Sequence, residues 1–283
     1  LFYAEGPHQW NYDGTLARFK HSYHSYAEAT TYFLNFDLGV GKRIAVQQDI
    51  PNSTVEVNTF DDYAFHETEA QHLNLSGRTW YGEVFKGTDP MNIVFEDFKN
   101  LDFNTRVYVE SRVASRSTLT TNTFTIAGNG QNLHTHSMTR IGGQQTDDYG
   151  RASTKNTEFE TNSDVITISA AYSRNDLDAT GWLDYIALNV RRNLIFDGGQ
   201  MDFRDARSVS INGVTKFTVG GLNESSKVWE VTDIGAVQKI NLTRAGSNYT
   251  FVNDASELRE YIAFDGTQFH TPSKAVGKIA QQN

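Results

Sequence analysis

The sequence predicts an all-β fold, a β-sandwich or jelly roll with a small additional N-terminal β-unit. Short runs of β-branched and aromatic residues alternate with polar residues along most of the chain. Gly, Asn and Asp interrupt these runs at intervals of about 8–12 residues, a spacing typical of sandwiches and jelly rolls. Helical periodicity is almost absent, since only residues 256–261 suggest a helix, of one or two turns.

A polar and acidic stretch between about Gln47 and Gly77 divides the chain. We therefore expect a small β-rich unit over residues 1–76 and a jelly-roll-like sandwich over residues 77–270. The few strands expected before residue 48 would be marginal alone, so we expect them to dock onto another part of the protein. We also expect the sequence to be a piece of a longer protein.

Individual strands are expected where the alternation is clearest. In chain order they cover residues 32–36, 107–113, 165–172, 181–194, 200–205, 209–211, 214–219, 228–231 and 249–252. Turns are expected at residues 128–130, 198–199, 212–213 and 220–221. Asn212-Gly213 is the strongest hairpin signal, because a type I′ turn needs positive φ at both central residues.

The longest expected strand, residues 181–194, is apolar on both faces, as in a central strand covered on both sides. Strict alternation places one set on one face, Trp182, Asp184, Ile186, Leu188 and Val190, and the other set on the opposite face, Leu183, Tyr185, Ala187 and Asn189. Asp184 needs a partner, because burying an unpaired charge is costly. The expected partner is Arg191, Arg192 or Arg204, and a register-fixing ion pair is favoured over a sugar- or peptide-binding site.

Composition limits the function. The 283 residues, 38% hydrophobic and 12% aromatic, can fill a large core. The net charge of −9 argues against binding nucleic acid or an anionic membrane surface. The chain contains no cysteine, which excludes a disulfide, a thiolate metal site and a cysteine nucleophile within it. No apolar run approaches the length of a membrane span.

Metal-binding candidates are weak, so the metal site is left unassigned. His134 and His136 share a strand face upstream of Asp147 and Asp148, a two-histidine, one-carboxylate pattern that is also common in exposed polar loops. Weaker still are two further groups, His21 with His24, and His66 with Glu67 and Glu69. The acidic pairs Asp61-Asp62 and Asp176/Asp178 could hold a structural calcium ion, although neither matches an EF-hand loop. No other cofactor is expected.

The aromatic residues raise a glycan-binding hypothesis, because aromatic faces stack on sugar rings. Trp182 and Trp229 lie within strand patterns and are expected in the core. Trp10 and Trp80 lie near turns and are the better candidates for exposed platforms. The residues alone therefore leave an acidic β-sandwich with no recognisable active site.

Five stretches, in order along the chain, resemble the gingipain-like cysteine peptidases that act as surface sortases of the type IX secretion system in Bacteroidetes. They are residues 1–10, 26–34 continuing to 39–43, 183–189 continuing to 200–205, 228–233, and 276–283. The resemblance implies an exported protein at the cell surface or outer membrane of a Gram-negative bacterium. In that family a catalytic domain removes the C-terminal signal of secreted cargo, which is then attached to anionic lipopolysaccharide.

The family's catalytic His–Cys pair does not carry over, because the chain has no cysteine and none of its histidines falls in a matching motif. The resemblance therefore implies the non-catalytic β-region of such a sortase, with no catalytic residues of its own and with residues 271–283 leading to a peptidase domain. Implied partners are that domain, secreted cargo and outer-membrane secretion components, without nucleic acid or direct membrane insertion. The alternatives are an independent carbohydrate-binding or adhesin-like module and, weaker, a metal-dependent hydrolase using His134 and His136.

Overall fold

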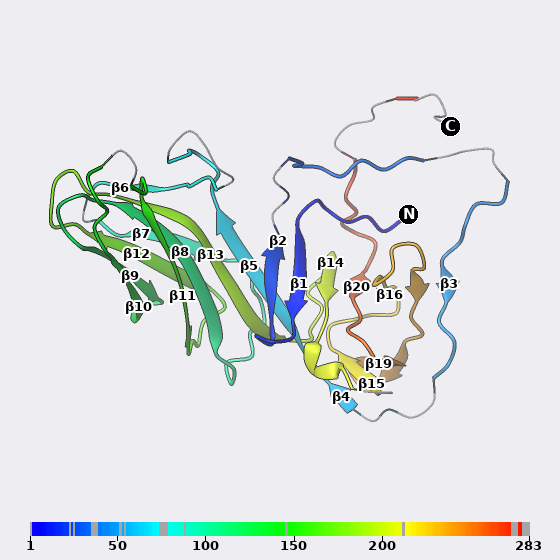
Figure 1. Cartoon of the computed structure of the whole chain (residues 1–283). Helices are drawn as coiled ribbons and strands as arrows, with labels where there is room; N and C mark the ends of the chain where they lie inside the picture. The colour runs from blue at the N-terminus through cyan, green and yellow to red at the C-terminus, as the bar shows by residue number, and fades with distance from the viewer. Residues whose placement is uncertain are drawn as a thin grey trace. The chain divides into compact units, whose positions relative to one another are not determined.

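The computed structural model describes residues 2–22, 24, 26–34, 39–50, 53, 55–73, 79–87, 89–144, 147–210, 213–272 and 277–278. Within these residues the protein is built almost wholly of β-strands (Figure 1), which confirms the predicted all-β class. The only helix in the described part is a single 3₁₀ turn, Ala206–Ser208. No described helix is long and apolar enough to cross a membrane.

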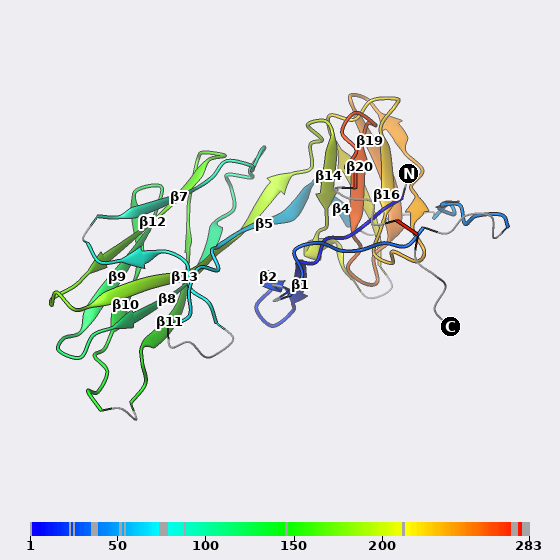
Figure 2. The same ribbon diagram turned by 90° about the horizontal axis from the view of Figure 1, so that it is seen from above.

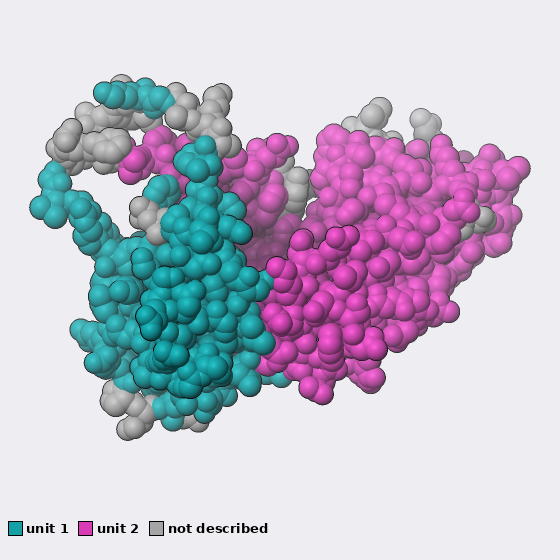
Figure 3. Space-filling model, turned by 180° about the vertical axis from the view of Figure 1, so that it is seen from behind, with its two compact units in different colours: residues 1–3, 37–58, 194–283 teal, residues 4–36, 59–193 magenta. Residues whose placement is uncertain are grey.

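The chain forms two compact units, coloured separately in Figure 3. Unit 1 contains residues 1–3, 37–58 and 194–283, and unit 2 contains residues 4–36 and 59–193. The predicted boundaries near residues 76 and 270 do not coincide with this division. The N-terminal 76 residues contribute to both units, and the long strand predicted at 181–194 ends where unit 2 ends.

Unit 2 is an eight-stranded jelly roll with two antiparallel sheets, ordered β11-β8-β13-β5 and β10-β9-β12-β7 (Figures 1 and 2). The first sheet contains β5 (Thr59–Glu67), β8 (Val107–Arg116), β11 (Arg151–Phe159) and β13 (Thr180–Asn193). The second contains β7 (Met91–Phe95), β9 (Asn122–Gly128), β10 (Gln131–Met138) and β12 (Ile166–Ser173). A short strand, β6 (Val84–Phe85), adds to the end of β13.

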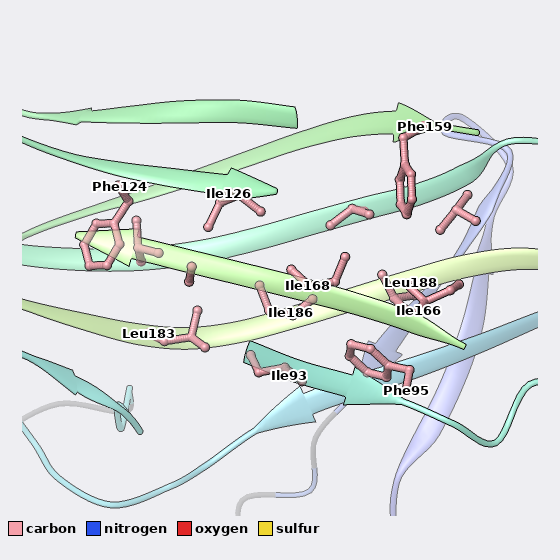
Figure 4. Close-up of a cluster of buried hydrophobic side chains, with 14 of the residues drawn as sticks. Ile93, Phe95, Phe124, Ile126, Phe159, Ile166, Ile168, Leu183, Ile186 and Leu188 are labelled. Atoms are coloured by element: carbon pink, nitrogen blue, oxygen red, sulfur yellow. The ribbon is translucent and has the colours of Figure 1, made fainter. Parts of the chain in front are cut away.

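The core of unit 2 fills the space between these two sheets. Alternate residues of each strand point inward, as period-2 patterning requires. Figure 4 labels ten of these side chains, which lie between the strands of the two sheets: Ile93, Phe95, Phe124, Ile126, Phe159, Ile166, Ile168, Leu183, Ile186 and Leu188. All ten are buried, so the first sheet is apolar on its inner face and its outer face is left for polar side chains.

The alternation of β13 is interrupted by a β-bulge at Asp184. Leu183 pairs with Val113 and Tyr185 pairs with the next residue of β8, Arg112, so Asp184 is an extra residue on β13. The predicted faces are correct after the bulge, where Ile186, Leu188 and Val190 lie opposite Tyr185, Ala187 and Asn189, but they are wrong across it. Leu183 shares the inner face with Ile186, Leu188 and Val190, whereas Trp182 packs in a separate cluster with Tyr81 and Ala114.

The N-terminal part of unit 2 is a hairpin of β1 (Gln9–Asp13) and β2 (Arg18–Ser22). The Asn189 side chain fixes it to β13. The Asn189 Oδ1 atom accepts from the Phe19 N–H at 2.7 Å, and Asn189 Nδ2 donates to the Phe19 carbonyl at 3.0 Å. The Asn189 side-chain amide thus makes the two hydrogen bonds to Phe19 that the backbone of a neighbouring strand would otherwise make.

Unit 1 also has two sheets, ordered β14-β20-β16-β17-β3 and β18-β19-β15-β4. Their strands are β3 (Ala45–Val46), β4 (Val55–Val57), β14 (Gln200–Phe203), β15 (Val214–Val219), β16 (Lys227–Glu230), β17 (Gln238–Lys239), β18 (Thr243–Ala245), β19 (Asn248–Asp254) and β20 (Tyr261–Phe264). The early strands β3 and β4 pair in parallel with β17 and β15, so this segment docks onto the C-terminal strands. Aromatic rings fill the interior, with Phe217 and Phe251 stacked at 4.7 Å.

Several local predictions are wrong. Residues 256–260 form no helix, and Tyr261 begins the buried strand β20. The described residues 32–34 and 209–210 are not strands.

The turn predicted at residues 128–130 is present: Asn129 and Gly130 have positive φ in the hairpin between β9 and β10. The turns at 198–199 and 220–221 connect strands of different sheets, and Asn212 lies outside the described residues.

Candidate functional site

Unit 2 carries a pocket of about 350 Å³ on the outer face of the β11-β8-β13-β5 sheet, beside strand β2. The strands supply its side chains because β5, β8 and β13 each turn alternate residues outward. The lining residues are Arg18, Phe19, Lys20, His21, Phe65, Glu67, Glu69, Thr79, Tyr108, Glu110, Arg112, Asp184, Tyr185, Ala187 and Asn189. Four of them are carboxylates, and three, Arg18, Lys20 and Arg112, are basic.

The bulge places Asp184 in this pocket rather than in the core. Its side chain is 1% exposed, and Oδ2 lies 2.8 Å from Nη1 of Arg112. That contact lacks hydrogen-bond geometry, so Oδ2 accepts no hydrogen bond. Burial raises the pKa of Asp184 to about 6, although the Arg112 charge acts in the opposite direction.

Glu67 and Glu69 form a carboxyl pair at the end of β5. Both side chains are partly exposed, and they are two residues apart, which puts them on the same side of an extended chain. Burial, and then the hydrogen bond and charge of Glu69, raise the pKa of Glu67 to about 8. At neutral pH Glu67 therefore holds its proton, because burial and a second carboxyl group both disfavour its charged form.

Glu110 is the fully paired carboxylate of the pocket. Tyr185 donates to Oε1 at 2.7 Å and Tyr108 donates to Oε2 at 3.0 Å. Burial is the main cause that raises the pKa of Tyr185 above the ordinary tyrosine value, and the hydrogen bond to Glu110 is the second. The guanidinium of Arg18 lies 3.6 Å from the centre of the Tyr108 ring, a cation–π contact.

His21, expected as a weak metal-ligand candidate, lines the pocket as an aromatic group. Its ring lies 3.9 Å from that of Phe65. Burial, and secondarily the charge of His8, lowers the pKa of His21 to about 4. The imidazole is therefore neutral at pH 7 and contributes no positive charge to the acidic pocket.

The three arginines expected as partners of Asp184 bind other carboxylates. Arg191 donates to Asp61 at 2.7 Å across the β13–β5 pair. The next residue, Arg192, donates to Asp62 at 2.8 Å. In unit 1, Arg204 pairs with Glu260. The prediction that Asp184 is held by an arginine is therefore correct in kind, but the partner named was wrong, because the bulge turns Asp184 toward β8.

His134 and His136 face the interior, where β10 approaches β8 and β11, and a directed chain of hydrogen bonds holds both rings. Thr157 donates to the Asn156 carbonyl, so it must accept from His134 Nδ1 at 3.0 Å. His134 Nε2 then accepts from Ser111 at 2.8 Å, and Ser111 accepts from His136 Nε2 at 2.9 Å.

The chain ends at Ser153, which donates to His136 Nδ1 at 2.9 Å. Every ring nitrogen is thus used by a hydroxyl group rather than left for a metal ion. Burial lowers the pKa of His134 and His136 to about 4 each. Among the described residues, no group of three or more His, Asp or Glu side chains is arranged to hold a metal ion. The histidine pair is therefore a structural bridge between the two sheets.

Three of the four acidic residues expected to bind calcium have hydrogen-bond partners in the structure, and the fourth, Asp178, is exposed. Asp61 and Asp62 bind the arginines of β13. Asp176 Oδ2 accepts from Ser117 at 2.7 Å and from Thr120 at 2.8 Å, and these hydrogen bonds lower its pKa. These carboxylates join strands and loops within unit 2.

Three of the four tryptophans lie as predicted, and Trp10 does not. Trp182 and Trp229 are buried, as expected. Trp80 is 40% exposed, whereas Trp10 is only partly exposed and stacks on Tyr63 at 3.9 Å. Trp10 is thus engaged in fixing the hairpin to β5 and is not a free platform for a sugar.

The fold and pocket define a two-unit, all-β protein whose larger unit is a jelly roll with an acidic pocket on one outer sheet face. No known family model and no curated protein sequence matches the chain. Among solved structures, it is similar to dimeric latent PorU from Porphyromonas gingivalis, with a TM-score of 0.81 over 100% of this chain at 18% sequence identity. The chain spans 27% of that PorU chain. At this identity the likeness shows a shared fold.

Weaker similarities involve parts of the chain. The carbohydrate-binding module CBM36, solved with calcium and xylotriose, has a TM-score of 0.29 at 14% identity, over 47% of this chain and 99% of that one. The insecticidal delta-endotoxin Cry8Ea1 from Bacillus thuringiensis has a TM-score of 0.29 at 14% identity, over 38% of this chain and 19% of that one. These values are too low to transfer any property to this protein.

The sequence placed Glu67 and Glu69 in one weak group, His21 in another and Asp184 by itself, and it did not predict that they share a pocket. The spacing of Glu67 and Glu69 carried a signal, because residues i and i+2 of an extended segment share a face. Arg112 and Glu110, which complete the pocket, lie in a strand that the alternation did predict. The sequence did not show that this strand pairs with β13.

Proposed function

We propose that this chain is the non-catalytic β-region of a surface sortase of the type IX secretion system, a gingipain-like cysteine peptidase. The observation that carries the proposal is the full-length structural similarity to PorU, with a TM-score of 0.81. The five ordered sequence stretches support it independently. Two of them coincide with the buried strands β13 and β16, where they would preserve the fold rather than perform chemistry.

In this proposal the region supports and positions a peptidase domain, which supplies the nucleophile that this cysteine-free chain lacks. The parent protein is exported to the cell surface, where the assembly processes the C-terminal signals of secreted cargo. The two compact units give such a domain a preformed β-scaffold, and the acidic pocket gives the region a surface on which a partner or cargo segment can bind.

The isolated chain should not cleave a peptide that carries a cargo C-terminal signal, whereas the parent sortase should cleave it. Deleting this region from the parent should reduce cargo processing in cells, and expressing the region separately should restore part of it. Cleavage by the isolated chain would contradict a non-catalytic role. Normal processing by a parent that lacks the region would contradict a positioning role.

A further inference from the structure

We propose that the pocket of unit 2 binds one basic side chain, a lysine ammonium or an arginine guanidinium presented by a peptide, and that Glu67 and Glu69 hold its charge. The described residues that line the pocket all belong to unit 2. The proposal goes beyond the sortase assignment and stands on the pocket alone.

The first argument is the charge balance of the pocket. Each basic lining group already has a partner: Arg112 pairs with Asp184, and Lys20 lies 3.4 Å from Asp13 outside the pocket. Arg18 stacks on Tyr108, whose hydroxyl is bound to a fourth carboxylate, Glu110. Glu67 and Glu69 neighbour each other, so the lining holds four carboxylates against three basic groups that already have partners.

The second argument is the proton that Glu67 holds. Burial and the nearby Glu69 keep Glu67 protonated at neutral pH, with a pKa of about 8. A ligand cation placed at the pair would take over the role of that proton. Binding would convert the Glu67 carboxylic acid into a carboxylate and release the proton to solvent, while the ligand's N–H groups would donate to the freed oxygens.

A third and independent observation is the buried Oδ2 atom of Asp184. It is aligned for a charge contact with Arg112 but accepts no hydrogen bond, although such groups are normally satisfied when buried. Among the described residues, Oδ2 thus has no donor besides the Arg112 guanidinium, and a second donor on this side of the pocket would complete its hydrogen bonding. A bound cation would add positive charge beside a carboxylate whose pKa burial raises to about 6.

The walls suit a long side chain with a charged end. Phe65 and Tyr185 stack with ring centres 5.4 Å apart, and the His21 ring extends this aromatic surface. The alkyl stem of lysine or arginine packs well on such surfaces while its head reaches polar groups. A volume of about 350 Å³ lies at the small end of ligand pockets and fits one side chain rather than a folded partner.

The test is isothermal titration calorimetry of the whole chain at pH 7 with Nα-acetyl-lysine-N-methylamide and Nα-acetyl-arginine-N-methylamide. The norleucine analogue is the neutral control. At least one basic probe should bind with a Kd below about 1 mM, whereas norleucine should not. Titrations in two buffers of different ionisation enthalpy should show release of close to one proton for each ligand bound.

The variant Glu67→Gln/Glu69→Gln should weaken binding by about tenfold or more, because it removes the charge-assisted hydrogen bonds. The matched control is Glu224→Gln/Glu257→Gln, which makes the same charge change at two exposed residues of unit 1. The control should bind like wild type, and circular dichroism and thermal unfolding should show both variants folded.

Three results would each overturn the proposal. One is that neither basic probe binds, or that norleucine binds equally well. Another is unchanged binding by a folded Glu67→Gln/Glu69→Gln variant. The third is binding without proton release, which would place the ligand away from the carboxyl pair.

Discussion

Two polar clusters of the same jelly roll differ in how completely their polar groups are hydrogen-bonded. On the inner side of the first sheet, Ser111 of β8 joins His134 and His136 in a chain where each donor meets one acceptor. On the outer side, Glu67 holds a proton beside Glu69, and within the described part of the chain the Asp184 Oδ2 atom has no partner besides its ion pair with Arg112. Hydrogen bonding is complete in the inner cluster and incomplete in the outer one.

The difference explains why residue type alone misled the search for a site. Histidines are frequent metal ligands, yet this pair is neutral and fully used by hydroxyl groups, as buried structural groups usually are. Glu67 and Glu69 gave only a weak metal-ligand signal and Asp184 was expected in an ion pair, yet the pKa values of Glu67 and Asp184 are raised to about 8 and about 6. Raised carboxyl pKa values in a pocket are the better indicator of a functional site.

The largest effect is expected from breaking the complete cluster. His136 is fully buried, so His136→Ala should remove about 3 kcal/mol from the free energy of unfolding. The loss combines a cavity with two hydroxyl groups, of Ser111 and Ser153, that lose their partner. Urea denaturation at pH 7.5 measures it. The exposed His24→Ala should change the free energy of unfolding by less than about 0.5 kcal/mol. Equally small changes for both variants would contradict a structural role for the hydrogen bonds of His136.

The second prediction uses pH. His134 and His136 have folded pKa values near 4, below the ordinary 6.5, so the unfolded chain binds more protons between these values. Their contribution is complete above pH 6.5 and is lost as the pH falls toward 4. His21 acts in the same direction, and Asp184 opposes it.

Glu67 also opposes the histidines, so the effect is best measured in the Glu67→Gln variant. Lowering the pH from 7 to 5.5 should cost that variant about 2 kcal/mol of unfolding free energy. Urea unfolding at the two pH values measures the loss. Equal stability at the two pH values would show that the histidines have ordinary pKa values in the folded protein and that the inner cluster does not keep them neutral.

The smallest effect is a gain in stability. The folded pKa of Glu67 is about 8 against an ordinary 4.5, so the folded chain binds more protons between these values and stability falls as the pH rises through them. Glu67→Gln removes this penalty. Because the side chain is partly exposed, the expected gain is about 1–2 kcal/mol at pH 8, with none at pH 4.5.

The exposed Glu224→Gln is the matched control for that gain and should stay within about 0.5 kcal/mol of wild type at both pH values. A destabilised Glu67→Gln at pH 8 would mean that the carboxylate has a partner stronger than Glu69. The outer cluster would then be complete, like the inner one.

The sequence predicted the strands where alternation was strong, such as 107–113 and 214–219, because period-2 patterning is a local property. It could not predict the bulge at Asp184, which exists only in relation to β8, nor the partners of Arg191 and Arg192 on β5. The helix expected at 256–261 fails for a similar reason. Tyr261 is buried in β20 between two neighbouring strands, and that packing overrides local propensity.

Carboxyl and imidazole protonation, followed by nuclear magnetic resonance across a pH titration, tests the contrast between the clusters most directly. With side-chain-labelled Glu and His, the Glu67 carboxyl signal should remain that of the acid up to pH about 8. The His136 ring should remain neutral, with hydrogen on Nε2, down to pH about 4. Ordinary titration of both groups, near pH 4.5 and 6.5, would contradict the account.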